Sequence, residues 1–108
     1  MTYSIIFLQP AVDDLDEIRR YVRKHFSQVV WQSAYAKIKR AISKLEQLPD
    51  AGHPVPELPE MHFLETIAAK NRVIYEVVGQ IVYIHIICDT RQDFRTELAR
   101  RPLRGLRT

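Results

Sequence analysis

The chain has 108 residues, of which 46% are apolar and 27% charged, and its formal net charge is +3. This length predicts a single domain with one core and little room for a deep internal pocket. No apolar run approaches the roughly 18 residues of a membrane-spanning helix, and a single cysteine excludes an internal disulfide. We therefore expect a cytoplasmic protein that does not enter a membrane.

The positive charge is concentrated at the C-terminal end. Residues 1–90 carry 10 basic and 11 acidic side chains, a net of −1, whereas residues 91–108 carry six arginines against two acids, a net of +4. Such a segment can bind an acidic protein or a phosphate backbone, or it can be a solvated tail. We predict one domain over residues 1–98 and a basic C-terminal tail over residues 99–108.

The first predicted elements are a strand and a long helix. Residues 3–8 read YSIIFL, a short run of β-forming residues, and Pro10 then suits the first turn of a helix. From Ala11 the apolar residues recur at helical spacing, at Leu15, Ile18, Val22 and Phe26. Acids fill the first turns of this helix and bases the last turns, which is the distribution that the helix dipole favours.

A second amphipathic helix is predicted after a short gap. Ser27 can cap its N-terminus, and its apolar face, which extends to Leu48, includes Trp31 and Tyr35 as predicted core residues. The short gap predicts an antiparallel helical hairpin. The helix must end at the run of breakers that follows, namely Pro49, Gly52, Pro54, Pro56 and Pro59.

Three strands complete the predicted domain, over residues 63–68, 72–78 and 81–88. Their short connections, Lys70-Asn71 and Gly79-Gln80, predict an antiparallel meander. The first strand is separated from these three by both helices and is expected to join the sheet from a distance. The order β-α-α-β-β-β predicts an α+β fold, a small antiparallel sheet with a helical hairpin packed on one face. A further short helix is predicted to end before Pro102.

Side chains alternate between the two faces of a sheet, which divides these strands into two sets. One set is wholly apolar and is predicted to pack on the helices: Val73, Tyr75, Val77, Val82, Ile84, Ile86 and Cys88. The other set is mixed and is predicted to form an uncovered face: Arg72, Ile74, Glu76, Ile81, Tyr83, His85 and Ile87. Exposed apolar residues in such number favour a partner surface, although the C-terminal segment or a second copy of the chain could cover them instead.

Arginines also converge in the predicted sheet. Because paired antiparallel strands place the start of one beside the end of the other, Arg72 and Arg91 are predicted to meet, with Arg95 nearby. Together they could hold phosphate or carboxylate. Alternatively, each arginine simply pairs with an acid such as Asp89, Asp93 or Glu76. No glycine-rich phosphate loop is present and the four histidines lack metal-ligand spacing, so we predict no metal and no cofactor.

Several segments, in order, resemble the RelE/ParE superfamily of bacterial toxins. They are "PAVDDLDEIRRYV", "LEQLPDAGHPVPEL", "NRVIYEVVGQIVYIHII" and "DTRQDF", and the resemblance spans residues 3–98. The resemblance implies a toxin of a type II toxin–antitoxin system. Such a toxin is neutralised by a cognate antitoxin that lays an extended segment and a helix over its surface, so a hetero-oligomer is expected.

The resemblance implies one of two lethal mechanisms. RelE-type members cut messenger RNA on the ribosome, and their strand arginine and post-sheet arginine match Arg72 and Arg91. Where they carry lysines, this chain has Phe63 and Glu65, and their near-terminal catalytic tyrosine falls at Glu97 or Leu98. The Glu65 carboxylate, at a position where a lysine is expected, would repel a phosphodiester. Cutting RNA would need another general base, for which the candidates are Glu65, Glu76 or His85.

ParE-type members are not known as enzymes and poison DNA gyrase by binding it. The long helical hairpin and the missing nuclease residues favour this ParE-like function for the chain. The alternatives are a RelE-like ribosome-dependent mRNA endonuclease and a non-toxic module that binds an antitoxin or RNA. The residues expected to contact the target or phosphate are Arg72, Arg91, Arg95, Arg100 and Arg101. Those expected to bind the antitoxin are Ile74, Ile81, Tyr83, His85 and Ile87.

Overall fold

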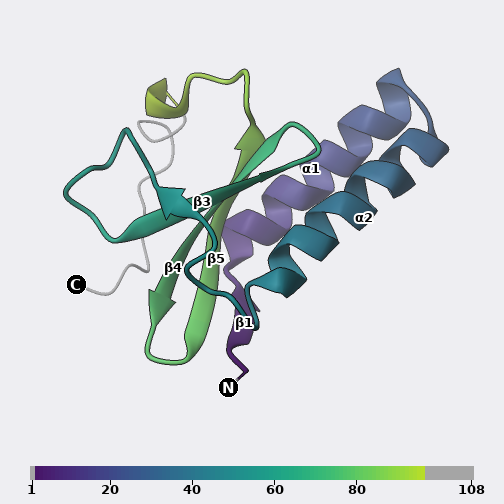
Figure 1. Ribbon diagram of the computed structural model, residues 1–108. Coiled ribbons are helices and arrows are strands. Elements are labelled where there is room, and N and C mark those ends of the chain that lie inside the picture. Colours follow the sequence, from purple (N-terminus) through teal and green to yellow (C-terminus); the bar gives the residue numbers. More distant parts are fainter. Residues whose placement is uncertain (1, 97–108) are drawn as a thin grey trace.

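The computed structural model describes residues 2–96, which form a sheet with a helical hairpin on one face (Figure 1). The predicted α+β order is confirmed, with one short strand in addition. In chain order the elements are β1 (Ser4–Phe7), α1 (Gln9–His25), α2 (Gln28–Lys44), β2 (His53–Pro54), β3 (Phe63–Ala68), β4 (Asn71–Val78) and β5 (Ile81–Asp89). Phe94 begins a further helical turn, but the predicted end of that helix, the boundary at residue 98 and the basic tail lie outside the described residues.

The helical hairpin begins and turns where local chemistry predicts. Pro10 lies in the first turn of α1, and the Ser27 Oγ accepts a hydrogen bond from the Val30 amide at 3.1 Å, which confirms the predicted cap of α2. Trp31 is 8% exposed and is a core residue as predicted. Tyr35 is 40% exposed, so its prediction as a core residue is wrong. It lies on the rim of a groove beside the short strand β1, which does not cover it.

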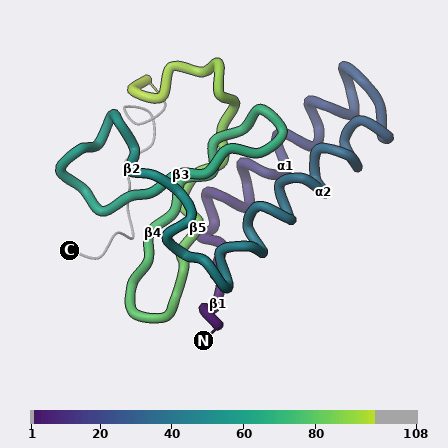
Figure 2. Tube along the Cα trace, in the orientation of Figure 1, coloured from purple at the N-terminus to yellow at the C-terminus, as the bar shows by residue number. Residues whose placement is uncertain are grey.

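The sheet has the order β1-β5-β4-β3-β2. β3, β4 and β5 form the predicted antiparallel meander. β1 joins the edge of the sheet parallel to β5, with Ser4 opposite Ile81 and Phe7 opposite Ile84. Figure 2 shows these two strands side by side although both helices separate them in sequence. The expectation that the first strand joins the sheet from a distance is confirmed.

One buried hydroxyl ties the end of the helical hairpin to the sheet. The Tyr75 Oη donates to the Pro49 carbonyl at 2.8 Å and accepts from the Gly52 amide at 3.0 Å. A Cβ at Gly52 would lie 2.5 Å from the Glu65 carbonyl oxygen and 2.6 Å from the Tyr75 Oη. The loop that follows α2 can approach β3 and β4 this closely only because residue 52 is glycine.

A β-bulge in β5 changes which side chains face the helices. Ile74 pairs with Ile86 but Tyr75 pairs with Ile84, so His85 is the extra residue of the longer strand. One inserted residue reverses the alternation of every side chain beyond it.

Because of this bulge, part of the predicted division of β5 is wrong. Val82 and Ile84, before the bulge, do pack in the helix-side core. Beyond the bulge it is Ile87 that packs there, whereas Ile86 and Cys88 pack on the opposite face. Alternation counted along the sequence cannot register an extra residue that only strand pairing reveals.

The opposite face of the sheet is covered, contrary to the prediction. A second core lies there, formed by Val55, Phe63, Ile74, Ile86, Cys88 and Phe94, with Leu58 packed against it. The segment between β2 and β3 supplies Val55 and Leu58 to this core, and the turn that follows β5 supplies Phe94. Ile74, His85 and Ile87 are buried, so they do not form an open partner surface, and only Ile81 and Tyr83 of the predicted antitoxin-binding set remain partly exposed.

Candidate functional site

Arg72 is held between two carboxylates on the covered face. Its Nε donates to Glu65 Oε1 at 2.6 Å, and its Nη1 and Nη2 donate to Glu57 Oε2 and Oε1 at 3.0 and 2.8 Å. Only 11% of the Arg72 side chain and 6% of the Glu65 side chain are exposed. The Glu57 contact is the bidentate geometry in which guanidinium and carboxylate bind most strongly. We call Arg72, Glu57 and Glu65 the Arg72 cluster.

Further contacts hold the Arg72 cluster in place and disfavour the binding of an anion to Arg72. The Arg72 Cζ lies 4.5 Å from the centroid of the Phe94 ring. Hydrogen bonding to Glu57 raises the pKa of Arg72, and the same hydrogen bonds lower the pKa of Glu57. The Nε, Nη1 and Nη2 atoms of Arg72 all donate to carboxylates, so a phosphate group would have to displace these carboxylates to bind Arg72.

Arg91 does not join Arg72, so the predicted anion-binding pair is not formed among the described residues. Its Nε and Nη2 donate to the two carboxylate oxygens of Asp89 at 3.0 and 2.9 Å, and 77% of its side chain is exposed. This pairing lowers the pKa of Asp89. Each arginine has its own acid, which is the alternative considered for them. Arg72 uses Glu57 and Glu65, which the sequence pattern did not single out as its partners.

Arg95 is exposed, and its amide donates to Asp93 Oδ1 at 3.1 Å. Its positive charge contributes to lowering the pKa of Glu57, so its side chain acts on the rim of the Arg72 cluster. Arg100 and Arg101, the other predicted target contacts, lie outside the described residues.

The two predicted acid–base candidates on the strands are paired and enclosed. The His85 Nε2 lies 3.2 Å from Glu76 Oε1, and 3% of the His85 side chain and 16% of the Glu76 side chain are exposed. The edge of the histidine ring meets the Phe63 ring with the centroids 5.1 Å apart. A general base must come within hydrogen-bond reach of its substrate, and a histidine beneath Phe63 cannot reach RNA on the surface in this arrangement. The third candidate, Glu65, is bound to Arg72.

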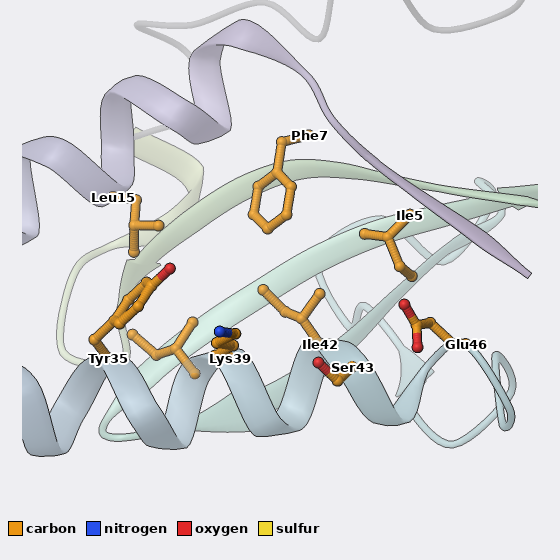
Figure 3. A pocket seen from close by; sticks show the side chains of 9 residues that line it. Ile5, Phe7, Leu15, Tyr35, Lys39, Ile42, Ser43 and Glu46 are labelled. Atoms are coloured by element: carbon orange, nitrogen blue, oxygen red, sulfur yellow. The ribbon is translucent and has the colours of Figure 1, made fainter.

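An open apolar groove lies on the other side of the sheet, between β1 and the helical hairpin (Figure 3). Its volume is about 210 Å³. Ile5 and Phe7 of β1 and Leu15 of α1 line one wall. The other wall is formed by α2, with Tyr35, Ile38, Lys39, Ile42 and Ser43, and by Glu46 in the turn that follows α2. We call this the β1 groove. Little in the sequence predicts the β1 groove. Only the apolar run in YSIIFL indicates apolar side chains on both faces of this strand.

The backbone of β1 is also available at the groove. β1 is the terminal strand of the sheet that the described residues form. The amides of Ser4 and Leu8 donate toward β5, to the carbonyls of Gln80 and Ile84. Because amide directions alternate along a strand, the amides of Ile5 and Phe7 point away from β5. This edge can accept one more strand.

Within residues 2–96 no cluster of histidine, cysteine, aspartate and glutamate residues could hold a metal ion. No helix among these residues is both long and apolar enough to cross a membrane.

Comparisons with known proteins give one family and one fold. The model of the ParE toxin of the type II toxin–antitoxin system parDE matches residues 5–94. No curated protein matches the sequence. A structure of the chromosomal ParDE toxin–antitoxin system from P. aeruginosa superposes with a TM-score of 0.71 at 18% identity, covering 82% of this chain and 96% of that one.

Two RelE-type structures are also similar. The toxin–antitoxin complex RelBE2 from Mycobacterium tuberculosis gives a TM-score of 0.58 at 15% identity, over 82% of this chain and 99% of that one. A double arginine-to-alanine mutant of the E. coli toxin RelE in the free state gives 0.56 at 15% identity, over 95% and 100%. At these identities the likeness establishes the fold that the three structures share with this chain.

Proposed function

The chain belongs to the family of ParE toxins of type II toxin–antitoxin systems, and from this membership we propose that it arrests growth by binding DNA gyrase and not by cutting RNA. Membership makes the chain a type II toxin with the RelE/ParE fold, whose partner class is an antitoxin.

The state of Arg72 carries the choice between gyrase and RNA. A nuclease needs cations that face the scissile phosphate and stabilise the charge that develops on it. Here the strand arginine is buried and bonded to Glu57 and Glu65. The arginine beyond the sheet, Arg91, is bonded to Asp89. The enclosed pair of His85 and Glu76 offers no substitute. These contacts support a toxin that acts by binding a protein and not by cutting RNA.

A plasmid topology gel tests the proposal. Purified toxin in excess is added to gyrase and relaxed plasmid, and we expect loss of negative supercoiling together with linear DNA from stalled cleavage complexes. The Ile67→Ser variant is a matched control, because Ile67 is 56% exposed on β3 and away from the β1 groove, and it should inhibit as the wild type does. Full supercoiling in the presence of folded wild-type toxin would contradict the proposal.

The RNA alternative is measured in parallel. In a translation reaction programmed with a defined message, the toxin should leave the transcript intact. Cuts within codons that disappear in the Arg72→Lys and Arg91→Lys variants would establish the endonuclease function instead. Induction of the chain in cells without any antitoxin addresses the non-toxic module, since in that case the cells would keep growing.

We place the antitoxin at the β1 groove. An extended segment can pair with the outward amides of Ile5 and Phe7, and apolar side chains beside it can enter the groove. Lys39 and Glu46, which also line the groove, can bind polar or charged groups of such a segment. The sheet face predicted from the sequence is replaced as the main contact, because Ile74 is buried on that face and Ile87 is buried on the helix side of the sheet.

Co-expression tests this placement. The open reading frame adjacent to the toxin gene is expressed as the candidate antitoxin, and it should restore growth in cells that express the wild-type toxin. We expect rescue to be lost for the Ile5→Ser, Phe7→Ser double variant and retained for Ile67→Ser. Equal rescue of both would place the antitoxin elsewhere without affecting the gyrase proposal.

A further inference from the structure

The far end of the helical hairpin exposes apolar side chains. Tyr21 is 54% exposed, Phe26 65%, Val29 72% and Val30 45%. In Figure 1 the connection between α1 and α2 projects beyond the sheet. We call these four residues, with the flanking Arg20, Arg23 and Lys24, the hairpin tip. Exposed apolar side chains that gather at one end of a small domain indicate an interaction site, whereas single apolar residues scattered over a surface do not.

The aromatic residues of the hairpin tip are contiguous. The Tyr21 ring lies 4.4 Å from the His25 ring and 6.5 Å from the Phe26 ring, measured between centroids. The Ser27 cap and the last turn of α1 set the path of the backbone between the two helices. Aromatic side chains held in place lose little conformational entropy on binding, which favours them as anchors at interfaces.

The hairpin tip lies in a segment without acids. Residues 18–45 contain eight lysines and arginines and no aspartate or glutamate. The carboxylates that precede this segment are Asp16 and Glu17, and Asp16 lies 2.6 Å from Arg19 and 3.4 Å from Arg20. Within the described part of the chain, no ion pair joins Arg23 or Lys24 to a carboxylate. Arg20 is thus paired with Asp16, whereas Arg23 and Lys24 leave positive charge beside the apolar residues that no ion pair of the described residues neutralises.

This combination selects the class of partner. A second copy of the chain would bring two sets of unneutralised cations together, which is unfavourable. A nucleic acid backbone would accept the cations but would gain nothing from the exposed Phe26 and Val29, since phosphates are contacted by polar and charged groups. An acidic protein surface with an apolar pocket satisfies both features.

We infer that the hairpin tip is the docking surface for the toxin's target protein, through an acidic face of that target that accepts Tyr21 and Phe26. This inference rests on the proposed function, in which the target is gyrase. The tip is separate from the β1 groove, because none of the tip residues lines that groove. One toxin molecule thus has distinct surfaces for its antitoxin and its target.

Two variants and one control test the inference. The apolar variant is Tyr21→Ser with Phe26→Ser, the charge variant is Arg23→Glu with Lys24→Glu, and the control is Ile67→Ser. All five residues are exposed, so the variants should fold, and circular dichroism and thermal melting verify this. The readouts are growth arrest at graded inducer levels and the toxin concentration that half-inhibits gyrase supercoiling.

We expect both tip variants to raise the half-inhibiting concentration by tenfold or more, because truncation of buried interface anchors and reversal of paired charges have effects of this size. The control should stay within about twofold, as expected for a surface substitution outside the interface. Higher salt should weaken inhibition by the wild type, since exposed charges are screened. Unchanged inhibition by both tip variants would overturn the inference.

The remaining outcomes separate this inference from the proposed function. If the wild type arrests growth but does not affect gyrase, the gyrase proposal fails, and loss of growth arrest in both tip variants still supports the tip as the target surface. If only the charge variant loses activity and it also loses binding to a 30-bp DNA duplex, the tip contacts a polyanion and the inference is overturned. A wild type that neither arrests growth nor inhibits gyrase overturns both.

Discussion

The positive charges of the Arg72 cluster and of the hairpin tip have opposite surroundings. Arg72 is buried, bonded to two carboxylates and stacked on Phe94. Arg23 and Lys24 are exposed at the end of a long segment without acids. From the sequence, Arg72 is a candidate site residue because it begins a predicted strand and matches the strand arginine of RelE-type toxins. Arg23 and Lys24 are explained by the dipole of α1 alone. The surroundings of each cation, and not its motif, determine whether it can meet a partner.

The comparison also explains how one fold can support different toxins. A strand arginine that faces solvent among other cations can bind RNA. The same arginine beneath acidic side chains becomes part of the core and leaves recognition to other surfaces. Glu65 contributes to this burial here, since its carboxylate accepts a hydrogen bond from the Arg72 Nε.

Removal of Arg72 should produce the largest loss of stability. Arg72→Ala leaves Glu57 and Glu65 without their cation, and an uncompensated buried charge costs about 3–5 kcal/mol. We expect a loss of this order in the free energy of unfolding measured by chemical denaturation. Arg91→Ala is the matched control, because its ion pair is exposed, and it should change the free energy by less than about 1 kcal/mol.

The Arg72 cluster can also be removed as a unit. Arg72→Met combined with Glu57→Gln and Glu65→Gln should recover a large part of the loss, since replacing a whole buried ion pair is much less harmful than breaking it. Equal small effects of Arg72→Ala and Arg91→Ala would contradict the structural role. So would a loss of growth arrest in Arg72→Ala at unchanged stability.

The contact between the Gly52 loop and Tyr75 should rank second. A Cβ at Gly52 would meet the Glu65 carbonyl at 2.5 Å, so Gly52→Ala should destabilise the domain by about 1–3 kcal/mol, as overpacking does. Tyr75→Phe should lower the stability by about 1–2 kcal/mol because it removes the hydrogen bonds to Pro49 and Gly52. Thermal or denaturant unfolding measures both, and an unchanged midpoint for Gly52→Ala would show that this loop can move away.

Acid should act on the Arg72 cluster more than on the exposed pair. The pKa of Glu57 is lowered in the folded state from its ordinary value of 4.5, first by its hydrogen bonds to Arg72. The unfolded chain therefore binds more protons at low pH, and the stability that Glu57 contributes above pH 4.5 is lost as the pH falls through its folded-state pKa. The free energy of unfolding should fall less steeply below pH 5 in Glu57→Gln than in the wild type.

Asp89→Asn is the companion measurement. Asp89 also has a lowered pKa because it bonds to Arg91, but its partner is mostly exposed and solvent screens the pair. We expect this variant to follow the wild-type acid profile more closely than Glu57→Gln does. The reverse order of the two variants would mean that the exposed pair stabilises the domain more than the Arg72 cluster.

Substitutions in the hairpin tip should have the smallest effect on stability. Val29→Thr and Phe26→Ser replace side chains that are 72% and 65% exposed, and each should change the free energy of unfolding by less than about 0.5 kcal/mol. A loss above 1.5 kcal/mol would show that these side chains belong to the core of the hairpin. The tip could not then be regarded as a free binding surface.

The order of the elements, the cap at Ser27, the antiparallel meander and the family could all be predicted from the residues alone. These features depend on local chemistry. Helical periodicity, a capping hydroxyl and a short connection between strands each act over a few residues. Motifs in a fixed order were enough to indicate the ParE branch.

Only the tertiary structure decided which face of the sheet is open and which partners the arginines take. The bulge at His85 reverses the alternation in β5, and the segment between β2 and β3 with Phe94 covers a face predicted to be bare. Glu57 reaches Arg72 across 15 residues of sequence. These outcomes depend on how distant segments pack together, and local periodicity contains no record of that packing.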